Sequence, residues 1–227
     1  MVFKKYMKYF YFIATNWNPV LALVTMIHEI QGEKKYNIDT VDLVTLSNLT
    51  LKDENLEHAT RYQAANYYLL QKAFGFLQGN KVSGNFVDFG CGKGRAMVVA
   101  AYSGFKEIIG IDFAKDLCDA AEQNIEKIRE KFPGVNFTVL WNDAVNYAID
   151  EGDKVFFFFN PFDESIMLQV AKNILKSLRD HPRQAYVIYM NPVHDDIFLS
   201  AGFEQVFYIK KLTYLELSIF YLDAMEN

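Results

Sequence analysis

The sequence has few cysteines, no long apolar run and no excess of positive charge. Its two cysteines, Cys91 and Cys118, form neither a metal-binding pattern nor a disulfide framework, which favours a reducing, cytoplasmic location. The apolar run at 20–27 is far shorter than the roughly 20 residues that cross a bilayer, so no transmembrane segment is expected. The net charge of −5 makes a nucleic acid the less favoured partner, because a protein that binds the phosphate backbone needs positive charge.

The composition indicates a globular protein. The chain has 227 residues, of which 51% are hydrophobic and 22% are charged, and this is enough for one domain with an extension. The four histidines are scattered without the spacing of metal ligands, so no metal site is expected.

The first 80 residues show no alternation of strands and helices, and we interpret them as an N-terminal helical cap. Pro19 favours the start of a helix and Gly32 its end, so a helix is predicted over 19–31. Apolar residues recur at helical spacing over 54–77, which predicts a second helix.

The extreme N-terminus combines lysines with aromatic residues. Lys4, Lys5 and Lys8 precede an aromatic run at 9–13. We expect these aromatic side chains to pack on the main domain. The alternative is weak interfacial contact with a membrane through residues 1–15.

Residues 81–227 alternate between strand and helix patterns, which predicts a wound α/β domain with a parallel sheet. The continuous apolar run at 155–159 indicates a strand that is buried on both faces. The last two strands follow each other directly, and they predict an antiparallel terminal hairpin on a seven-stranded sheet with six parallel strands and one antiparallel strand. Strands are predicted at 85–89, 107–111, 136–140, 154–159, 185–190, 203–210 and 213–222, and helices at 93–103, 115–131, 163–180 and 193–201.

The most informative segment is a glycine loop between the first of these strands and the helix after it. Three glycines at alternate positions allow a tight turn and a close approach of the backbone to a ligand. Such a loop between strand and helix is typical of a nucleotide-type cofactor site. The segment reads Asp88, Phe89, Gly90, Cys91, Gly92, Lys93, Gly94.

Polar residues also end the next three strands. Asp112 ends the second strand, where a carboxylate can accept both hydroxyl groups of a ribose. The third strand is followed by Asn142-Asp143-Ala144 and the fourth by Asn160-Pro161-Phe162. Each group taken alone has a structural alternative, as a helix cap or a turn. Because all of them fall at the same edge of the predicted sheet, a ligand site is the favoured interpretation.

Two common phosphate-binding loops do not match this pattern. The dinucleotide fingerprint requires a third glycine at its sixth position, which Arg95 occupies here. The acid Asp88, in the strand before the glycines, is also unfavourable beside a pyrophosphate. A Walker loop requires Ser or Thr after Gly-Lys, and Gly94 stands there instead. Asp88 suits a ligand with a positively charged end.

In the order and spacing of these motifs, residues 60–222 resemble the class I S-adenosylmethionine-dependent methyltransferases, which have a Rossmann-like fold. The resemblance implies that the glycine loop, including Phe89 and Cys91, faces the methionine and ribose parts of the cofactor. It implies that Asp88 holds the amino end and that Asp112 binds the ribose hydroxyls, with Phe113 against the adenine. Asp143 would contact the adenine amino group, supported by Asn142 and Ala144.

The segment Asn160-Pro161-Phe162 resembles the Asn/Asp-Pro-Pro-aromatic motif of amine and amide N-methyltransferases. In this chain Phe162 takes the place of the second proline. The resemblance implies that Asn160 also contacts the cofactor and that the three residues hold a target nitrogen. Asp163 and Glu164 are the nearest candidate bases, with an alternative role as acids of a first helical turn.

The resemblance leaves the acceptor open. A protein side chain or a small amine is favoured, an RNA base is the second interpretation, and a non-catalytic cofactor-binding module is the third.

Overall fold

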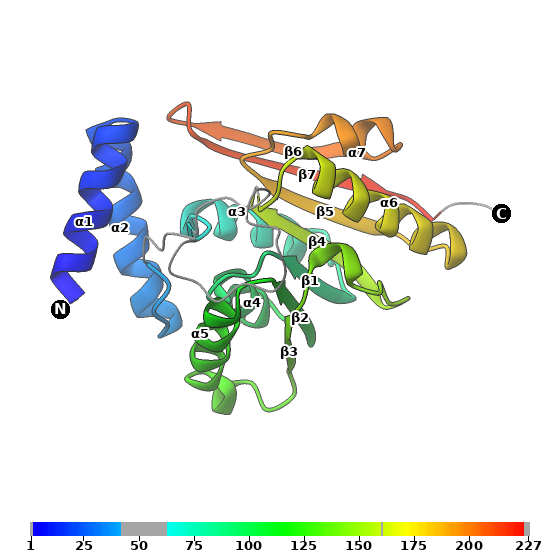
Figure 1. Ribbon diagram of the computed structural model, residues 1–227, viewed down its shortest axis with the longest axis horizontal. Coiled ribbons are helices and arrows are strands. Elements are labelled where there is room, and N and C mark those ends of the chain that lie inside the picture. The colour runs from blue at the N-terminus through cyan, green and yellow to red at the C-terminus, as the bar shows by residue number, and fades with distance from the viewer. Residues whose placement is uncertain (1, 42–62, 160, 225–227) are drawn as a thin grey trace.

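The computed structural model describes residues 2–41, 63–159 and 161–224. Its centre is a seven-stranded sheet with the strand order β3-β2-β1-β4-β5-β7-β6 (Figure 1). Six strands run in one direction, and β7 is antiparallel to its neighbours β5 and β6. The strands are β1 (Asn85–Phe89), β2 (Glu107–Asp112), β3 (Asn136–Trp141), β4 (Asp153–Phe159), β5 (Ala185–Met190), β6 (Glu204–Lys211) and β7 (Leu215–Leu222). The predicted sheet and its terminal hairpin are confirmed.

Helices cover both faces of this sheet. They are α1 (Val2–Asn16), α2 (Pro19–Tyr36), α3 (Tyr67–Gly79), α4 (Arg95–Tyr102), α5 (Lys115–Glu126), α6 (Glu164–Asp180) and α7 (Asp196–Ser200), with the short 3-10 turns η3 (Arg129–Lys131) and η4 (Ala144–Asn146). Side chains from α1 to α5 share one buried cluster with the sheet, and those from α6 and α7 share a second cluster on the opposite face.

The phenylalanine-rich strand β4 connects the two clusters. Val155 and Phe157 belong to the first cluster, whereas Phe156 and Phe158 belong to the second. Successive side chains of a strand point to opposite faces, so a strand covered on both sides is apolar throughout. The prediction of a doubly buried strand is therefore confirmed.

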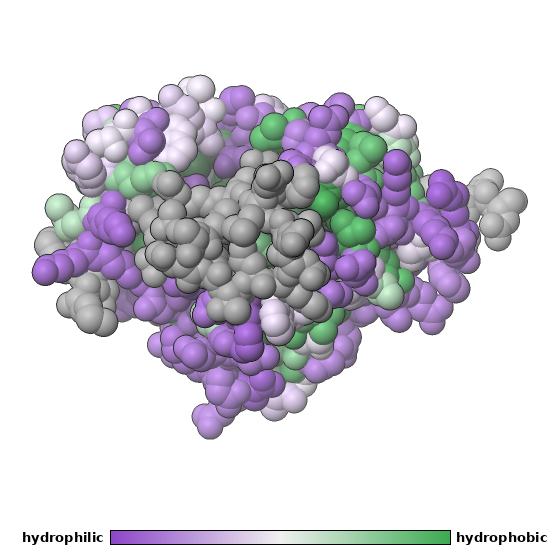
Figure 2. Space-filling view, viewed as in Figure 1, coloured by the Kyte–Doolittle hydropathy of each residue, from purple (hydrophilic) through white to green (hydrophobic). Residues whose placement is uncertain are grey.

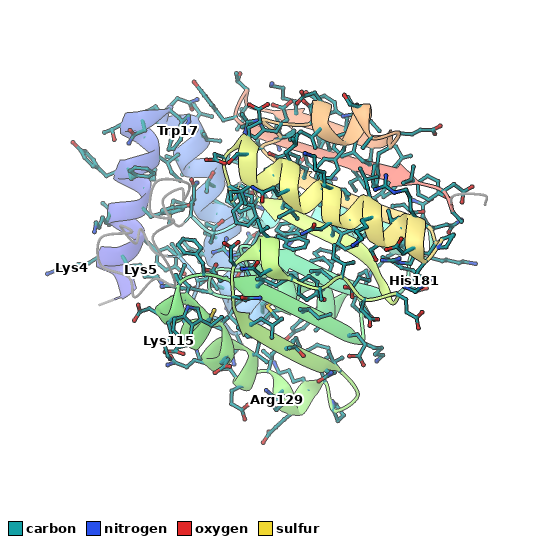
Figure 3. All side chains as sticks on the ribbon, turned by 45° about the vertical axis from the view of Figure 1, so that its right-hand side comes forward. Lys4, Lys5, Trp17, Lys115, Arg129 and His181 are labelled. Carbon is teal, nitrogen blue, oxygen red and sulfur yellow. The ribbon has the colours of Figure 1, made fainter. Side chains whose placement is uncertain are left out.

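The outer surfaces of the helices differ in polarity: α2 exposes Leu23, Ile27 and Ile30, whereas other helices expose charged side chains. Hydrophilic residues dominate the surface over α5 (Figure 2), and Lys4, Lys115 and Arg129 lie at the periphery of the molecule (Figure 3). No helix in the described parts of the chain combines the length and the apolar character needed to cross a membrane.

The N-terminal segment contains one helix for which the sequence analysis gave no bounds and a second helix whose end differs from the prediction. Residues 2–16 form a helix, α1, which pairs with α2 and buries Tyr9 and Ile13 in the first cluster. The helix α2 does not end at Gly32 but continues to Tyr36, and Asn37 caps it in a left-handed conformation. A Cβ atom at Gly32 would lie 2.3 Å from the ring of Tyr67, so this glycine is required by close packing and not by a helix end.

The helix predicted over 54–77 is also different in the structure. Residues 54–62 lie outside the described part of the chain, and residues 63–66 are not helical. The helix α3 begins at Tyr67 because the side chain of Asn66 accepts a hydrogen bond from the backbone N–H of Tyr68 at 2.9 Å. This is the usual role of Asn before a helix, and periodicity alone does not show it.

The domain boundary near residue 80 stays a prediction. The described residues before it bury side chains in the same cluster as the sheet.

Candidate functional site

The glycine loop and the ends of the strands meet at one edge of the sheet. In the sheet order, β1 lies between β2 and β4, so the loop after β1 has the end of β2 on one side and the end of β4 on the other. The backbone N–H groups of Gly90 and Cys91 donate to the carbonyl oxygen of Ile111 in β2 at 2.8 and 3.0 Å. The loop is therefore held against the strand that ends in Asp112.

The loop conformation requires its glycines. Gly90, Gly92 and Gly94 have positive φ angles of 78°, 53° and 76°, which residues with a side chain adopt only with strain. A Cβ atom at Gly90 would also lie 2.6 Å from the Cβ of Pro161. The structure thus brings the glycine loop into direct contact with the segment after β4, two motifs that are far apart in the sequence.

Asp112 binds the loop rather than the following helix. Its Oδ2 accepts a hydrogen bond from the N–H of Gly92 at 2.8 Å, and its Oδ1 accepts one from Ala114 at 2.9 Å. The residue before α5 is Ala114, so the alternative role of Asp112 as the N-cap of that helix does not apply. Burial raises the pKa of Asp112 to about 6, although the backbone N–H groups oppose this rise.

Asp88 is the second buried acid of this edge. Its Oδ1 atom has no hydrogen-bond partner among the described residues. Burial, and then the charge of Asp112, raise the pKa of Asp88 well above its usual value. A buried carboxyl oxygen without a partner is uncommon because it costs free energy. Such an atom is well suited to a ligand that donates hydrogen bonds or carries positive charge.

Cys91 is not an activated nucleophile in this structure. It is buried, and burial together with the charges of Asp112 and Asp88 raises the pKa of its thiol well above the usual range. A reactive thiol needs a lowered pKa.

The end of β3 lies beside β2. The N–H of Asn142 donates to the carbonyl oxygen of Asp112 at 3.0 Å, and the indole N–H of Trp141 donates to that of Phe113 at 3.0 Å. Asp143 caps η4 through the N–H of Val145 at 3.0 Å. Ala144 is buried and Phe113 is half-buried. The residues expected around an adenine are therefore neighbours here, and Asp143 also has a structural role.

The segment after β4 is only partly described. Asn160 lies outside the described residues. Phe162 is buried among apolar side chains of the second cluster. Asp163 is the N-cap of α6 and accepts from the N–H of Ile166 at 3.1 Å, while Glu164 lies in the first turn. The structural alternative for these two acids, as residues of a helix start, is what the structure shows.

A buried ion cluster, which the sequence analysis missed, links the N-terminal helices to the loop. The Nη1 atom of Arg95, directly after the glycines, lies 2.6 Å from Oε2 of Glu29 on α2. Arg95 also donates to Oγ1 of Thr40 and to the carbonyl oxygen of Ala65, both at 2.7 Å. Burial raises the pKa of Glu29 to about 7, and Arg95 opposes that rise.

Thr40 and Tyr67 complete this cluster. The N–H and the hydroxyl of Thr40 donate to Oε1 of Glu33 at 2.7 and 2.6 Å. The guanidinium of Arg95 lies 4.1 Å from the ring centre of Tyr67. The one sequence signal for the cluster is the pair Glu29 and Glu33, two acids one turn apart within an apolar helix.

Asn124 of α5 forms a second link. Its Nδ2 donates to the carbonyl oxygens of Lys93 and Asp39, both at 3.1 Å, and its Oδ1 accepts from the N–H of Asp39 at 3.0 Å. The glycine loop is thus connected to the N-terminal segment from two sides.

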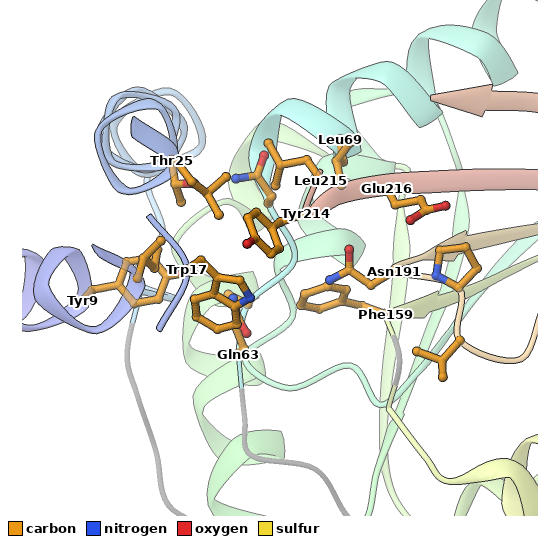
Figure 4. A pocket seen from close by; sticks show the side chains of 16 residues that line it. Tyr9, Trp17, Thr25, Gln63, Leu69, Phe159, Asn191, Tyr214, Leu215 and Glu216 are labelled. Carbon is orange, nitrogen blue, oxygen red and sulfur yellow. The ribbon is translucent and has the colours of Figure 1, made fainter. Parts of the chain in front are cut away.

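A cavity of about 290 Å³ opens beside this edge, at the carboxyl ends of β4 and β5. Five segments supply its described lining: the corner between α1 and α2, residues 63–69, the end of β4, the residues after β5, and residues 214–216 between β6 and β7. The side chains of Trp17, Tyr214 and Phe159 lie around the same space (Figure 4). Gln63, from the segment before α3, also lines this cavity.

Within residues 2–41, 63–159 and 161–224, no group of three or more His, Cys, Asp or Glu side chains is placed to hold a metal ion.

Comparison with known proteins identifies the fold. No family model and no curated protein match the sequence. Solved structures do match. A putative RNA methyltransferase from Pyrococcus horikoshii is similar with a TM-score of 0.53 and 18% identity, over 80% of this chain and 96% of the other.

Two further structures give the same result. An S-adenosylmethionine-dependent methyltransferase from Clostridium acetobutylicum has a TM-score of 0.52 and 11% identity, over 70% of this chain and 93% of the other. A tRNA (uracil-54, C5)-methyltransferase from Pyrococcus abyssi, solved with S-adenosyl-L-homocysteine, has a TM-score of 0.51 and 12% identity, over 70% of this chain and 39% of its own. The chain therefore has the Rossmann-like fold of the class I methyltransferases.

Proposed function

We propose that this protein is an S-adenosylmethionine-dependent methyltransferase. The observation that carries the proposal is the arrangement of three features at one sheet edge: the glycine loop with its positive φ angles, the buried Asp112, and the Asp88 oxygen that has no partner among the described residues. The fold that positions them is the one found in methyltransferases of known structure.

The residues present fit this cofactor. The unpartnered Asp88 oxygen suits its positively charged amino end, and the glycine backbone leaves room for close approach. The carboxylate of Asp112 has lone pairs left beyond its two backbone contacts, and these suit the ribose hydroxyls. Phe113, Asn142, Asp143 and Ala144 would surround the adenine.

When bound, the cofactor would supply a methyl group on a positively charged sulfur, for transfer to a lone pair of the acceptor. The chain's own contribution is to place the acceptor in line and to exclude water. Since Asp163 is engaged as a helix cap, the side chains around β4 favour an acceptor whose lone pair is already free.

The finer assignment concerns the acceptor atom. We propose nitrogen, on a protein side chain or another amine, because Asn160-Pro161-Phe162 resembles the motif of N-methyltransferases. The position of Pro161 against Gly90 supports a role of this segment beside the cofactor loop.

Titration calorimetry tests the cofactor assignment. We expect purified protein to bind S-adenosylhomocysteine with micromolar affinity and not to bind NAD. Binding of NAD alone, or of neither compound, would contradict the proposal. A gel-shift experiment with total RNA at physiological salt separates an RNA acceptor from the other acceptors, because only a protein that acts on RNA is expected to retard the RNA.

A further inference from the structure

The cavity at the ends of β4 and β5 lies next to the proposed cofactor loop. Phe159, at its wall, ends β4, and the preceding Phe158 is paired in register with Phe89, which directly precedes Gly90. Asn191, which also lines the cavity, follows Met190, the register partner of Phe159. A molecule in this cavity would therefore lie beside the glycine loop.

The cavity is small and its mouth is aromatic. Its volume of about 290 Å³ is at the lower end of small-molecule sites, which are roughly 300–1,000 Å³. Trp17 and Tyr214 are 38% and 41% exposed, and their rings are 6.5 Å apart in an edge-to-face arrangement. One ring comes from the α1–α2 corner and the other from the β6–β7 turn, and their contact gives the mouth an aromatic surface on which a flat molecule can pack.

The lining includes a buried hydrogen-bond donor that has no partner among the described residues. Asn66 is only 7% exposed and lines the cavity. Its Oδ1 is used to cap α3, while its Nδ2 has no hydrogen-bond partner among the described residues. A buried amide donor in this state favours a ligand with an oxygen or nitrogen that accepts a hydrogen bond.

The described lining of the cavity contains one charged residue, Glu216. Both carboxylate oxygens of Glu216 already accept hydrogen bonds, from the hydroxyl of Tyr208 and from Nζ of Lys210, each at 2.7 Å. Among the described residues, the lining therefore favours an uncharged ligand over a protonated lysine or a phosphate group.

We propose that this cavity binds the methyl acceptor, and that the acceptor is a small, planar, uncharged aromatic compound with a hydrogen-bond acceptor directed at Asn66. The inference rests on the proposed methyltransferase function for the role of the ligand. It favours a small molecule over the protein side chain and the RNA base. An aromatic amine meets the requirement for a nitrogen with a free lone pair.

Fluorine NMR of protein labelled with fluorotryptophan tests the binding site. The chain has two tryptophans, and each reports a different site: Trp17 lies at the cavity mouth, and Trp141 contacts Phe113 beside the proposed adenine position. The variant Trp17→Phe assigns the two signals. S-adenosylhomocysteine should shift the Trp141 signal and para-aminoacetophenone the Trp17 signal, so failure of the cofactor assignment and failure of the cavity assignment are seen separately.

Three related probes define the chemistry. We expect para-aminoacetophenone to bind more tightly than para-ethylaniline, which lacks the carbonyl group, and than cyclohexyl methyl ketone, which lacks the planar ring. If none of the three compounds shifts the Trp17 signal at millimolar concentration, the proposal is overturned. It is also overturned if a peptide with an unmodified lysine, or an RNA oligonucleotide, shifts this signal instead.

The variant Asn66→Ser tests the donor. Serine retains an N-cap for α3 but removes Nδ2. We expect it to weaken para-aminoacetophenone about fivefold, as for the loss of one neutral hydrogen bond, and to leave para-ethylaniline unchanged. Binding of S-adenosylhomocysteine serves as the folding control. If the variant weakened the binding of both aromatic probes equally, or of neither, Asn66 would not donate a hydrogen bond to the ligand.

Discussion

The glycine loop and the neighbouring cavity differ in how they are built. The loop is one continuous strand–turn–helix segment, and its conformation is imposed by positive φ angles at three nearby glycines. The cavity takes its described lining from five segments that are distant in the sequence. The comparison teaches that one edge of the sheet can combine a site that is encoded locally with a site that exists only once the chain has folded.

The ion cluster around Arg95 joins the glycine loop to the N-terminal helices, and its disruption should have the largest effect. Arg95→Met would leave Glu29 buried without its partner, and we expect it to lower the free energy of unfolding by about 3–5 kcal/mol. Urea unfolding measures this loss. Because the cost comes from an uncompensated charge, the double variant with Glu29→Gln should recover part of it.

The matched control is the ion pair of Lys115 and Asp119 on the outside of α5 (Figure 3). Lys115→Ala should leave the unfolding midpoint unchanged, since exposed pairs contribute little. If Arg95→Met also left the unfolding midpoint unchanged, the cluster would not be a structural link between the N-terminal helices and the loop.

The next largest effect is expected at Gly90. Gly90→Ala adds a Cβ in a left-handed conformation and places it 2.6 Å from Pro161, so we expect a loss of about 2–4 kcal/mol in stability and no detectable binding of S-adenosylhomocysteine. Urea unfolding and calorimetry measure the two quantities. Gly75→Ala is the control, because a Cβ there meets nothing within 4 Å. It should stabilise the helix α3 slightly.

Asp112 should control cofactor affinity. Asp112→Ala is expected to weaken S-adenosylhomocysteine by about 1.5–3 kcal/mol, the range for charge-assisted hydrogen bonds. Calorimetry of the variant beside the unaltered protein measures the difference. Normal affinity in the variant would refute the position of the ribose.

The same residue predicts how binding depends on pH. Asp112 must be ionised to accept the ribose hydroxyls, and its pKa in the free protein is raised to about 6. Affinity should therefore be highest above pH about 6 and fall toward tenfold per pH unit below it. In Asp112→Asn that fall should disappear, and any remaining pH dependence would be assigned to Asp88, whose pKa is also raised. An unchanged pH profile in the variant would contradict this assignment.

The smallest effect is expected at the cavity mouth. Trp17 is partly exposed, so Trp17→Ala should change thermal stability little and leave S-adenosylhomocysteine binding within about twofold, while it weakens the aromatic probe. Thermal unfolding and calorimetry measure both. Loss of S-adenosylhomocysteine binding would mean that the mouth belongs to the cofactor site and would remove the distinction between the two regions.

Local patterns were sufficient to predict most of the sheet. Strand β1 has the predicted bounds, and β2 to β5 differ from the prediction by at most one residue at either end. Their apolar runs and the polar residues after them are features of a few neighbouring positions. The helix ends were less predictable, because Gly32 looked like a stop signal and is instead a contact site for Tyr67.

The sequence by itself determined the wound sheet and the glycine loop. Hydrophobic periodicity selects strand or helix within one segment, and the freedom of glycine acts at single residues, so neither depends on distant parts of the chain.

Only the tertiary structure decided which side chains meet at the edge of the sheet. The partners of Arg95 come from α2 and the residues after it, the contact between Gly90 and Pro161 comes from the pairing of β1 with β4, and the donor of Asn66 becomes significant only beside Trp17 and Tyr214. The physical reason is that ion pairing, close packing and unsatisfied hydrogen bonds depend on which groups are adjacent in space after burial.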